Sequence, residues 1–177
     1  MKYYTGIGSR STPEHILKLM TKIGKYLALK GYVLRSGGAN GADTAFEIGC
    51  DQVNGEKDIF IPWVGFNDRT CGIVPHVTPE IVKEVSELHP AWDRCSEAAR
   101  KLHCRNYFQV NGNKGELGSS FIVCWTPSGK DVGGTAMALK LGKRRNIPII
   151  NLANPNALKE LVDLVKQEEL LDNGLCF

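Results

Sequence analysis

Glycine-rich turns follow three short apolar segments of this 177-residue chain, and each turn leads into a helical pattern. The turns lie at 6–10 (GIGSR), 35–43 (RSGGANGAD) and 131–135 (DVGGT). A strand that ends in a glycine turn and continues as a helix begins a βαβ unit, because neighbouring parallel strands are joined by a crossover. The chain is therefore expected to fold as an α/β protein.

The alternation of strands and helices continues to the end of the chain. We expect strands at 3–7, 32–34, 58–61, 120–125 and 147–152. We expect helices at 12–30, 41–50, 78–88, 92–104, 133–143 and 156–171. This order predicts one Rossmann-like domain spanning residues 1–177, with a mostly parallel sheet and helices on both faces. In such sheets, ligands bind beyond the carboxyl ends of the strands.

Composition and charge exclude several classes of protein. The chain is 42% hydrophobic and 23% charged, which is typical of a globular protein. Because it has no run of about 18 apolar residues and no signal-peptide pattern, we expect a cytoplasmic protein without a membrane partner. The net charge of +3 is compatible with a local anion site, but it is below the basic excess of a dedicated duplex-binding protein.

The cysteines give no metal-site or disulfide pattern. None belongs to a C-x-x-C pair, and Cys95 with His103 and Cys104 lacks the spacing of a zinc site. We therefore expect no metal and no cofactor, and reduced thiols at all six positions. These are Cys50, Cys71, Cys95, Cys104, Cys124 and Cys176.

The three glycine turns are candidates for a shared phosphate-binding pocket. Glycine allows backbone N–H groups to approach a phosphate, a helix N-terminus favours negative charge, and arginine matches phosphate oxygens. The alternative for each turn is ordinary turn chemistry without a ligand. The predicted ligand-binding residues are Gly8, Ser9, Arg10, Arg35, Ser36, Gly37, Gly38, Ala39, Asp43, Arg105, Asn106, Gly133, Gly134 and Thr135.

Several candidates have two interpretations. Arg105 is either a solvated cation at a helix end or a phosphate ligand. Trp63 and Trp125 are candidates for stacking on a base, and Trp63 alternatively seals the edge of the sheet. Asp43 either stabilises a helix N-terminus or contacts a sugar hydroxyl. Glu47, one turn later, is a candidate general acid.

Four motifs occur in an order that resembles a known superfamily: GIGSR at 6–10, SGGAxGxD at 36–43, HxRN at 103–106, and Gly134-Thr135 before a helix and the strand IPI at 147–149. Over residues 3 to 153 the chain is similar to DNA-processing protein A (Smf) and to the Lonely-guy, lysine-decarboxylase-like phosphoribohydrolases. The resemblance implies a Rossmann-like fold, a phosphate pocket and a homo-oligomer. In the first branch the loops and arginines meet single-stranded DNA. In the second, a PGGxGTxxE motif binds a nucleoside monophosphate, and its glutamate and an arginine help to break the N-glycosidic bond.

The chain departs from the hydrolase motif at one important position. Ala138 stands three residues after Thr135, where the motif has its glutamate. Our leading hypothesis is therefore a protein that binds a nucleotide or nucleotide-derived phosphate ligand. The alternatives are a nucleoside 5'-monophosphate N-glycosidase that uses Glu47 and Arg105, and a single-stranded DNA-binding module.

Overall fold

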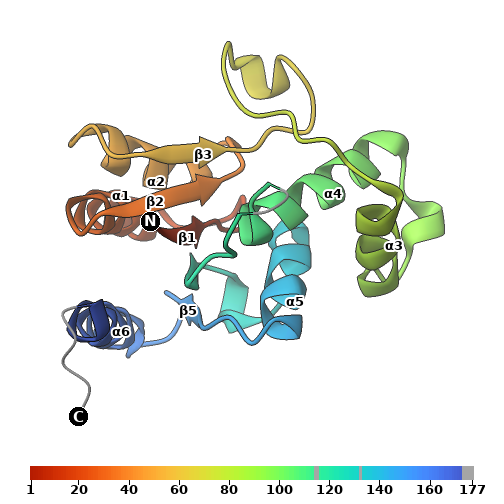
Figure 1. The fold of residues 1–177 in the computed structure, drawn as a ribbon. Coiled ribbons are helices and arrows are strands. Elements are labelled where there is room, and N and C mark those ends of the chain that lie inside the picture. Colours follow the sequence, from red (N-terminus) through yellow and green to blue (C-terminus); the bar gives the residue numbers. More distant parts are fainter. Residues whose placement is uncertain (114–115, 132, 173–177) are drawn as a thin grey trace.

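The protein forms a five-stranded parallel sheet in the order β3-β2-β1-β4-β5 (Figure 1). The computed structural model describes residues 1–113, 116–131 and 133–172. All four strand pairs are parallel. The strands are β1 (Lys2–Gly6), β2 (Tyr32–Ser36), β3 (Lys57–Ile59), β4 (Phe121–Cys124) and β5 (Ile149–Asn151).

Helices cover both faces of the sheet. Helices α1, α2 and α6 lie on one face and α4 and α5 on the other, with α3 packed outside α4 and α5 (Figure 1). This arrangement confirms the predicted Rossmann-like α/β fold. The helices are α1 (Glu14–Leu29), α2 (Ala42–Asp51), α3 (Pro79–Leu88), α4 (Glu97–Asn111), α5 (Ala136–Arg144) and α6 (Ala157–Asp172). Short 3-10 turns are η1 (Phe66–Asp68), η2 (Trp92–Arg94), η3 (Pro127–Gly129) and η4 (Gly133–Thr135).

Each face of the sheet has its own apolar core. On one face, Phe46 of α2 and Leu27 of α1 are fully buried against Tyr4 and Leu34. On the other, Leu141 of α5 is buried against Ile122. Because both faces are covered, β4 is a continuous apolar run, with all four residues buried, rather than an alternating one.

The fourth helix differs from the expected 92–104. Residues 92–94 form the separate turn η2, and Ser96 then caps α4 by accepting a hydrogen bond from the backbone N–H of Ala99. The helix continues to Asn111 and ends at Gly112, whose φ of 70° suits glycine. Arg105 and Asn106 therefore lie inside a helix instead of following one.

The strand order changes direction beside β1. From β1 the chain moves outward through β2 and β3, then returns to place β4 on the other side of β1. The carboxyl ends of β1 and β4 thus flank the topological switch point, where open α/β sheets bind their ligands. Within the described ranges, no helix has the length and apolarity needed to cross a membrane.

Candidate functional site

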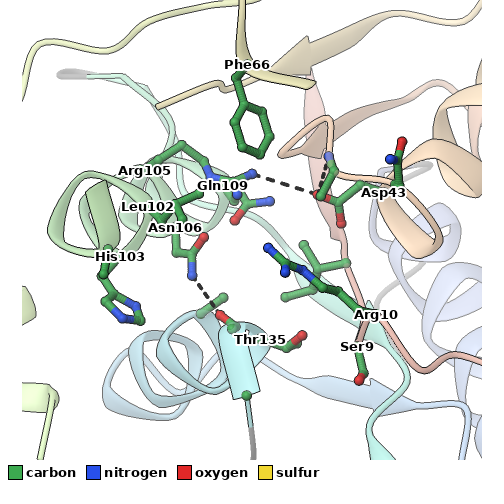
Figure 2. Close-up of a pocket in the computed structure, with 18 residues that line it drawn as sticks. Ser9, Arg10, Asp43, Phe66, Leu102, His103, Arg105, Asn106, Gln109 and Thr135 are labelled. Carbon is green, nitrogen blue, oxygen red and sulfur yellow. Dashed lines mark hydrogen bonds and ion pairs between the residues drawn. The ribbon is translucent and has the colours of Figure 1, made fainter. Parts of the chain in front are cut away.

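A cavity of about 350 Å³ opens at the switch point, beyond the carboxyl ends of the strands (Figure 2). Loops after β1, β2 and β4 form it together with one face of α4. This places parts of all three glycine turns around one hollow. The lining residues are Ile7, Gly8, Ser9, Arg10, Ala39, Asn40, Asp43, Phe66, Ala99, Leu102, His103, Arg105, Asn106, Gln109, Gly133, Gly134, Thr135 and Ala138.

The turn after β1 extends the sheet into the cavity wall. The backbone N–H of Ser9 donates to the carbonyl of Trp125, and the Thr12 hydroxyl donates to the carbonyl of Ser9. A Cβ on Gly8 would come within 2.5 Å of the Ala42 Cβ, so only glycine allows this turn to pack on α2. The exposed Arg10 points from this turn toward the middle of the cavity (Figure 2).

The turn after β2 contributes Ala39 and Asp43, but not the residues before them. The backbone N–H of Ala39 donates to the Asp43 carboxylate at 3.2 Å. Gly37 supports the site from behind, since a Cβ there would lie 1.2 Å from Nη1 of Arg105. Gly38 is packed against the Arg69 side chain, and the Ser36 hydroxyl donates to the carbonyl of Gly6. These three predicted ligand residues therefore shape the wall without lining the cavity.

The turn after β4 lies at the opposite side of the cavity from the second turn. Gly133 has a φ of 68°, which favours glycine, and Thr135 leads into the N-terminus of α5. The side-chain amide of Asn106 donates to the carbonyl of Gly134 at 2.9 Å, which ties this turn to α4. Apart from its two chain neighbours, no described residue has an atom within 4 Å of the place where a Gly134 Cβ would be.

Arg105 is a buried cation on the cavity wall with hydrogen-bonding capacity to spare. Arg105 is 6% exposed. Its Nη1 atom lies 3.7 Å from the Asp43 carboxylate and 3.5 Å from the carbonyl oxygen of Phe60. Within the described residues, its buried Nε has no hydrogen-bond partner. Burial lowers the pKa of Arg105, and the charge of Asp43 opposes this shift. The protein's own groups therefore compensate the buried charge of this guanidinium poorly.

Asp43 is the carboxylate of the site. Burial raises its pKa above the ordinary value, while the charge of Arg105 and hydrogen bonds from backbone N–H groups act in the opposite direction. The raised pKa makes Asp43 easier to protonate than an exposed aspartate. It lies at the start of α2, so its carboxylate also faces the helix N-terminus, as one of the two sequence interpretations expects.

The prediction that Arg35 belongs to the phosphate site is wrong, because its side chain does not line the cavity. Arg35 lies inside β2, one residue before the strand ends, and its side chain is fully buried away from the cavity. It donates to the Glu116 carboxylate and the Leu117 carbonyl. Its guanidinium lies 3.6 Å from the centre of the Tyr3 ring. The Arg35 side chain therefore stabilises the fold through these contacts.

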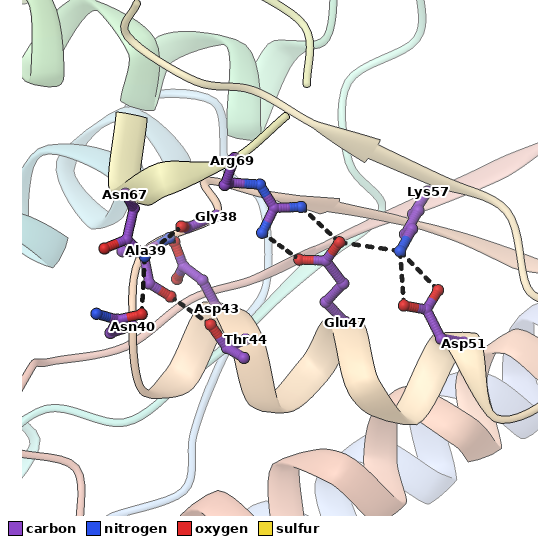
Figure 3. A network of polar contacts seen from close by, with 10 residues as sticks. All are labelled: Gly38, Ala39, Asn40, Asp43, Thr44, Glu47, Asp51, Lys57, Asn67 and Arg69. Carbon is purple, nitrogen blue, oxygen red and sulfur yellow. Dashed lines mark hydrogen bonds and ion pairs between the residues drawn. The ribbon is translucent and has the colours of Figure 1, made fainter. Parts of the chain in front are cut away.

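Glu47 also lies outside the cavity, because its carboxylate is occupied elsewhere (Figure 3). Arg69 donates to both of its oxygens at 2.6 and 2.9 Å, and Lys57 donates at 2.9 Å. Burial alone would raise the pKa of Glu47, but the hydrogen bonds from Arg69 and Lys57 outweigh burial and lower it. A low pKa and fully used oxygens do not suit the predicted general acid.

The aromatic side chain at the cavity is Phe66, not either predicted tryptophan. Phe66 lies across the cavity from Thr135 (Figure 2), and the Arg105 guanidinium is 5.8 Å from its ring centre. Trp63 packs edge-on against Phe66 from behind, at 5.4 Å between ring centres. Trp125 packs against the core on the α1 face. Neither indole lines the cavity.

The remaining lining residues come mainly from α4, and of these only Asn106 was among the predicted ligands. Ala99, Leu102, His103, Asn106 and Gln109 recur at helical spacing and form one face of this helix. Extending the helix beyond Cys104 would have revealed this face. Asn40 and Phe66 carry no comparable signal, because their side-chain directions depend on loop conformation.

Five cysteines are free thiols in the structure: Cys50, Cys71, Cys95, Cys104 and Cys124. Cys176 lies outside the described residues. Burial raises the pKa of the Cys104 thiol to about 11 and that of Cys124 to about 12, so both are protonated and unreactive at neutral pH.

The fold has relatives of known structure. No protein-family model and no curated protein sequence matches the chain. Two structures of the molybdenum cofactor carrier protein from Chlamydomonas reinhardtii match 99% of this chain and 87% of their own. Their TM-scores are 0.52 and 0.54, at 22% and 19% sequence identity. This similarity supports the Rossmann-like fold that the sequence predicts.

Proposed function

We propose that this protein binds a small phosphate-bearing ligand of the nucleotide type in the switch-point cavity. The observation that carries the proposal is Arg105, a buried guanidinium that lines the cavity and whose Nε has no hydrogen-bond partner in the part of the chain that the structure describes. A phosphate would supply the missing acceptors and a full countercharge, in the geometry that guanidinium groups bind best. The cost of burying this cation is then offset by the ligand.

The remaining walls suit the other parts of such a ligand. Gly133, Gly134 and Thr135 present backbone at the start of α5, where negative charge is favoured. Arg10 adds a second cation from the opposite loop, and Phe66 offers an apolar face for a ring (Figure 2). The volume of about 350 Å³ lies in the range of small-molecule sites.

The full-length similarity to a carrier of the molybdenum cofactor adds that cofactor to the nucleotides as a candidate ligand. Mass spectrometry of material retained through purification, together with metal analysis for molybdenum, would distinguish the two. Assembly into a homo-oligomer and location in the cytoplasm remain predictions.

Gly134→Ala provides a sharp test of the binding site. Beyond its chain neighbours, the added methyl meets no atom of the described residues within 4 Å, so the melting temperature should stay within about 1–2 °C of the wild type. A phosphate at the start of α5 would meet this methyl, and we expect AMP or inorganic phosphate to bind at least about tenfold more weakly, or about 1.4 kcal/mol. Gly118→Ala, whose methyl would make only an ordinary van der Waals contact 3.7 Å from the Val110 carbonyl oxygen, is the matched control.

Isothermal titration of the full chain with AMP, a cyclic nucleotide and inorganic phosphate measures these affinities. Saturable binding that Gly134→Ala weakens and Gly118→Ala preserves would support the proposal. Absence of saturable binding by the wild type, or equal binding by Gly134→Ala, would contradict it.

A hydrolytic function is the second candidate, and Asp43 favours it. This carboxyl group has a raised pKa and lies in the cavity beside Arg105. A carboxyl group with a raised pKa is more readily protonated, and in that form it can act as a general acid in cleavage of a glycosidic bond. Chromatographic detection of free base from AMP, lost in Asp43→Asn, would support hydrolysis. Stable binding of AMP without release of base would identify a binding protein.

A further inference from the structure

Three metal-ligating side chains meet beside the cavity, outside the phosphate-binding groups. They are His89, which follows α3, Cys95, which follows η2, and His103 on α4. One ligand atom from each lies within 4.8 Å of the other two. Cys95 Sγ is 3.7 Å from Nδ1 and 3.8 Å from Nε2 of His89, and the two imidazole ring centres are 4.4 Å apart.

We infer that His89, Cys95 and His103 form a binding site for a zinc ion. Two imidazoles and one thiolate are a donor set that zinc prefers. With Zn–S of about 2.3 Å and Zn–N of about 2.0 Å, a tetrahedral ion separates sulfur and nitrogen by about 3.5 Å. The observed distances from Cys95 to His89 are close to this value. Three protein ligands leave the fourth position to water.

The three ligands are positioned by contacts that do not involve a metal. Arg100 of α4 donates to the carbonyl of Trp92, which fixes η2 and hence Cys95 against the helix that carries His103. Lys140 of α5 donates to the carbonyl of Leu88, directly before His89. A preformed site loses little conformational entropy when it binds its ion.

The imidazole ring of His103 provides a second observation that supports a metal site. Its Nδ1 is buried and has no hydrogen-bond partner among the described residues. His103 also lines the cavity edge (Figure 2), so the ion would lie next to the ligand pocket while leaving Arg105 and the glycine turns free.

Cobalt substitution tests the site directly. The full chain, with any purification tag removed, should bind one Co²⁺ per chain and show thiolate-to-cobalt charge-transfer absorption that competing Zn²⁺ abolishes. Cys95→Ser should lose this absorption, and its affinity should fall by more than the 10–100-fold that loss of an outer-shell contact costs. Cys71→Ser and His15→Ala alter exposed residues outside the cluster and should bind like the wild type.

A second measurement needs no substitution. Zn²⁺ binding replaces the Cys95 thiol proton, which is released to solvent, and should slow alkylation of Cys95 at least tenfold, as located by mass spectrometry. Alkylation of the exposed Cys71 should not change. Lack of saturable Co²⁺ binding, retention of the absorption in Cys95→Ser, or equal alkylation with and without Zn²⁺ would each overturn the inference. These readouts are independent of nucleotide binding.

Discussion

Arg105 of α4 and Asp43 of α2 face each other across the back of the cavity, with Nη1 3.7 Å from Oδ2. Both side chains are 7% exposed. They come from opposite faces of the sheet and meet beyond the strand ends, where α2 begins and α4 passes over the loops. The distance is too long for a hydrogen bond, so the pair leaves the guanidinium donors available to a ligand.

The first prediction concerns Arg105 itself. Arg105→Met should reduce the affinity for AMP or inorganic phosphate by about 10–150-fold, because a hydrogen bond to a charged group contributes about 1.5–3 kcal/mol. Isothermal titration measures this loss. Arg145→Met is a suitable control, because Arg145 pairs with Glu84 outside the cavity. Equal losses in both variants would show that Arg105 acts only through net charge.

The second prediction is a pH dependence set by Asp43. Its folded-state pKa is raised by burial, so it gains a proton as the pH falls from neutral toward acid. Protonation removes a negative charge beside the anion site, and sulfate should therefore bind more tightly as the pH decreases. Sulfate does not titrate in this range, which isolates the effect of the protein. NMR titrations between pH 7 and 4.5 should show this increase in the wild type and a flat profile in Asp43→Asn.

The third prediction separates Arg35 from the binding site. Arg35→Met removes the partner of Glu116 and Asp58 and the stacking on Tyr3. The free energy of unfolding should fall by about 3 kcal/mol, since a buried pair loses one member. Urea denaturation measures this change. Lys18→Met, at an exposed pair with Glu14, should cost less than about 0.5 kcal/mol. Because Arg35 does not line the cavity, AMP binding under folding conditions should be unchanged.

The sequence predicted the position of the site in the fold better than it predicted which side chains line the site. Alternating apolar segments and glycine turns located five parallel strands and the sheet edge where the cavity lies. Gly134 and Thr135, two of the predicted ligand residues, line the cavity, because a turn that leads into a helix at the end of a strand has little conformational choice. These features depend on local chain geometry, which can be predicted from the spacing of apolar residues and glycines along the sequence.

Side-chain direction depends on contacts that spacing does not record. Arg35 and Ser36 precede the glycines, but β2 extends two residues beyond the expected strand at 32–34, so both remain within the sheet. Cys95 and His103 become neighbours of His89 only because a break at Ser96 turns the chain between η2 and α4. No linear spacing rule describes that break.

The fourth prediction assigns Glu47 a structural role. Its carboxylate anchors Arg69 (Figure 3). Arg69 directly follows η1, which carries the cavity-lining Phe66. Glu47→Gln should lower the free energy of unfolding by about 1–2 kcal/mol at pH 7, because Arg69 and Lys57 lose a charged acceptor.

The pH dependence of this effect follows from the lowered pKa of Glu47. A carboxylate with a lowered folded-state pKa contributes stability above its unfolded pKa of about 4.3, and that contribution is lost as the pH falls through the folded value. The stability difference between wild type and Glu47→Gln, measured by urea denaturation, should therefore shrink below pH 4. Glu97→Gln, at an exposed pair with Lys101, should show little difference at any pH. If Glu47→Gln instead kept full stability and AMP affinity but lost release of free base, Glu47 would be a catalytic acid and the structural role would be wrong.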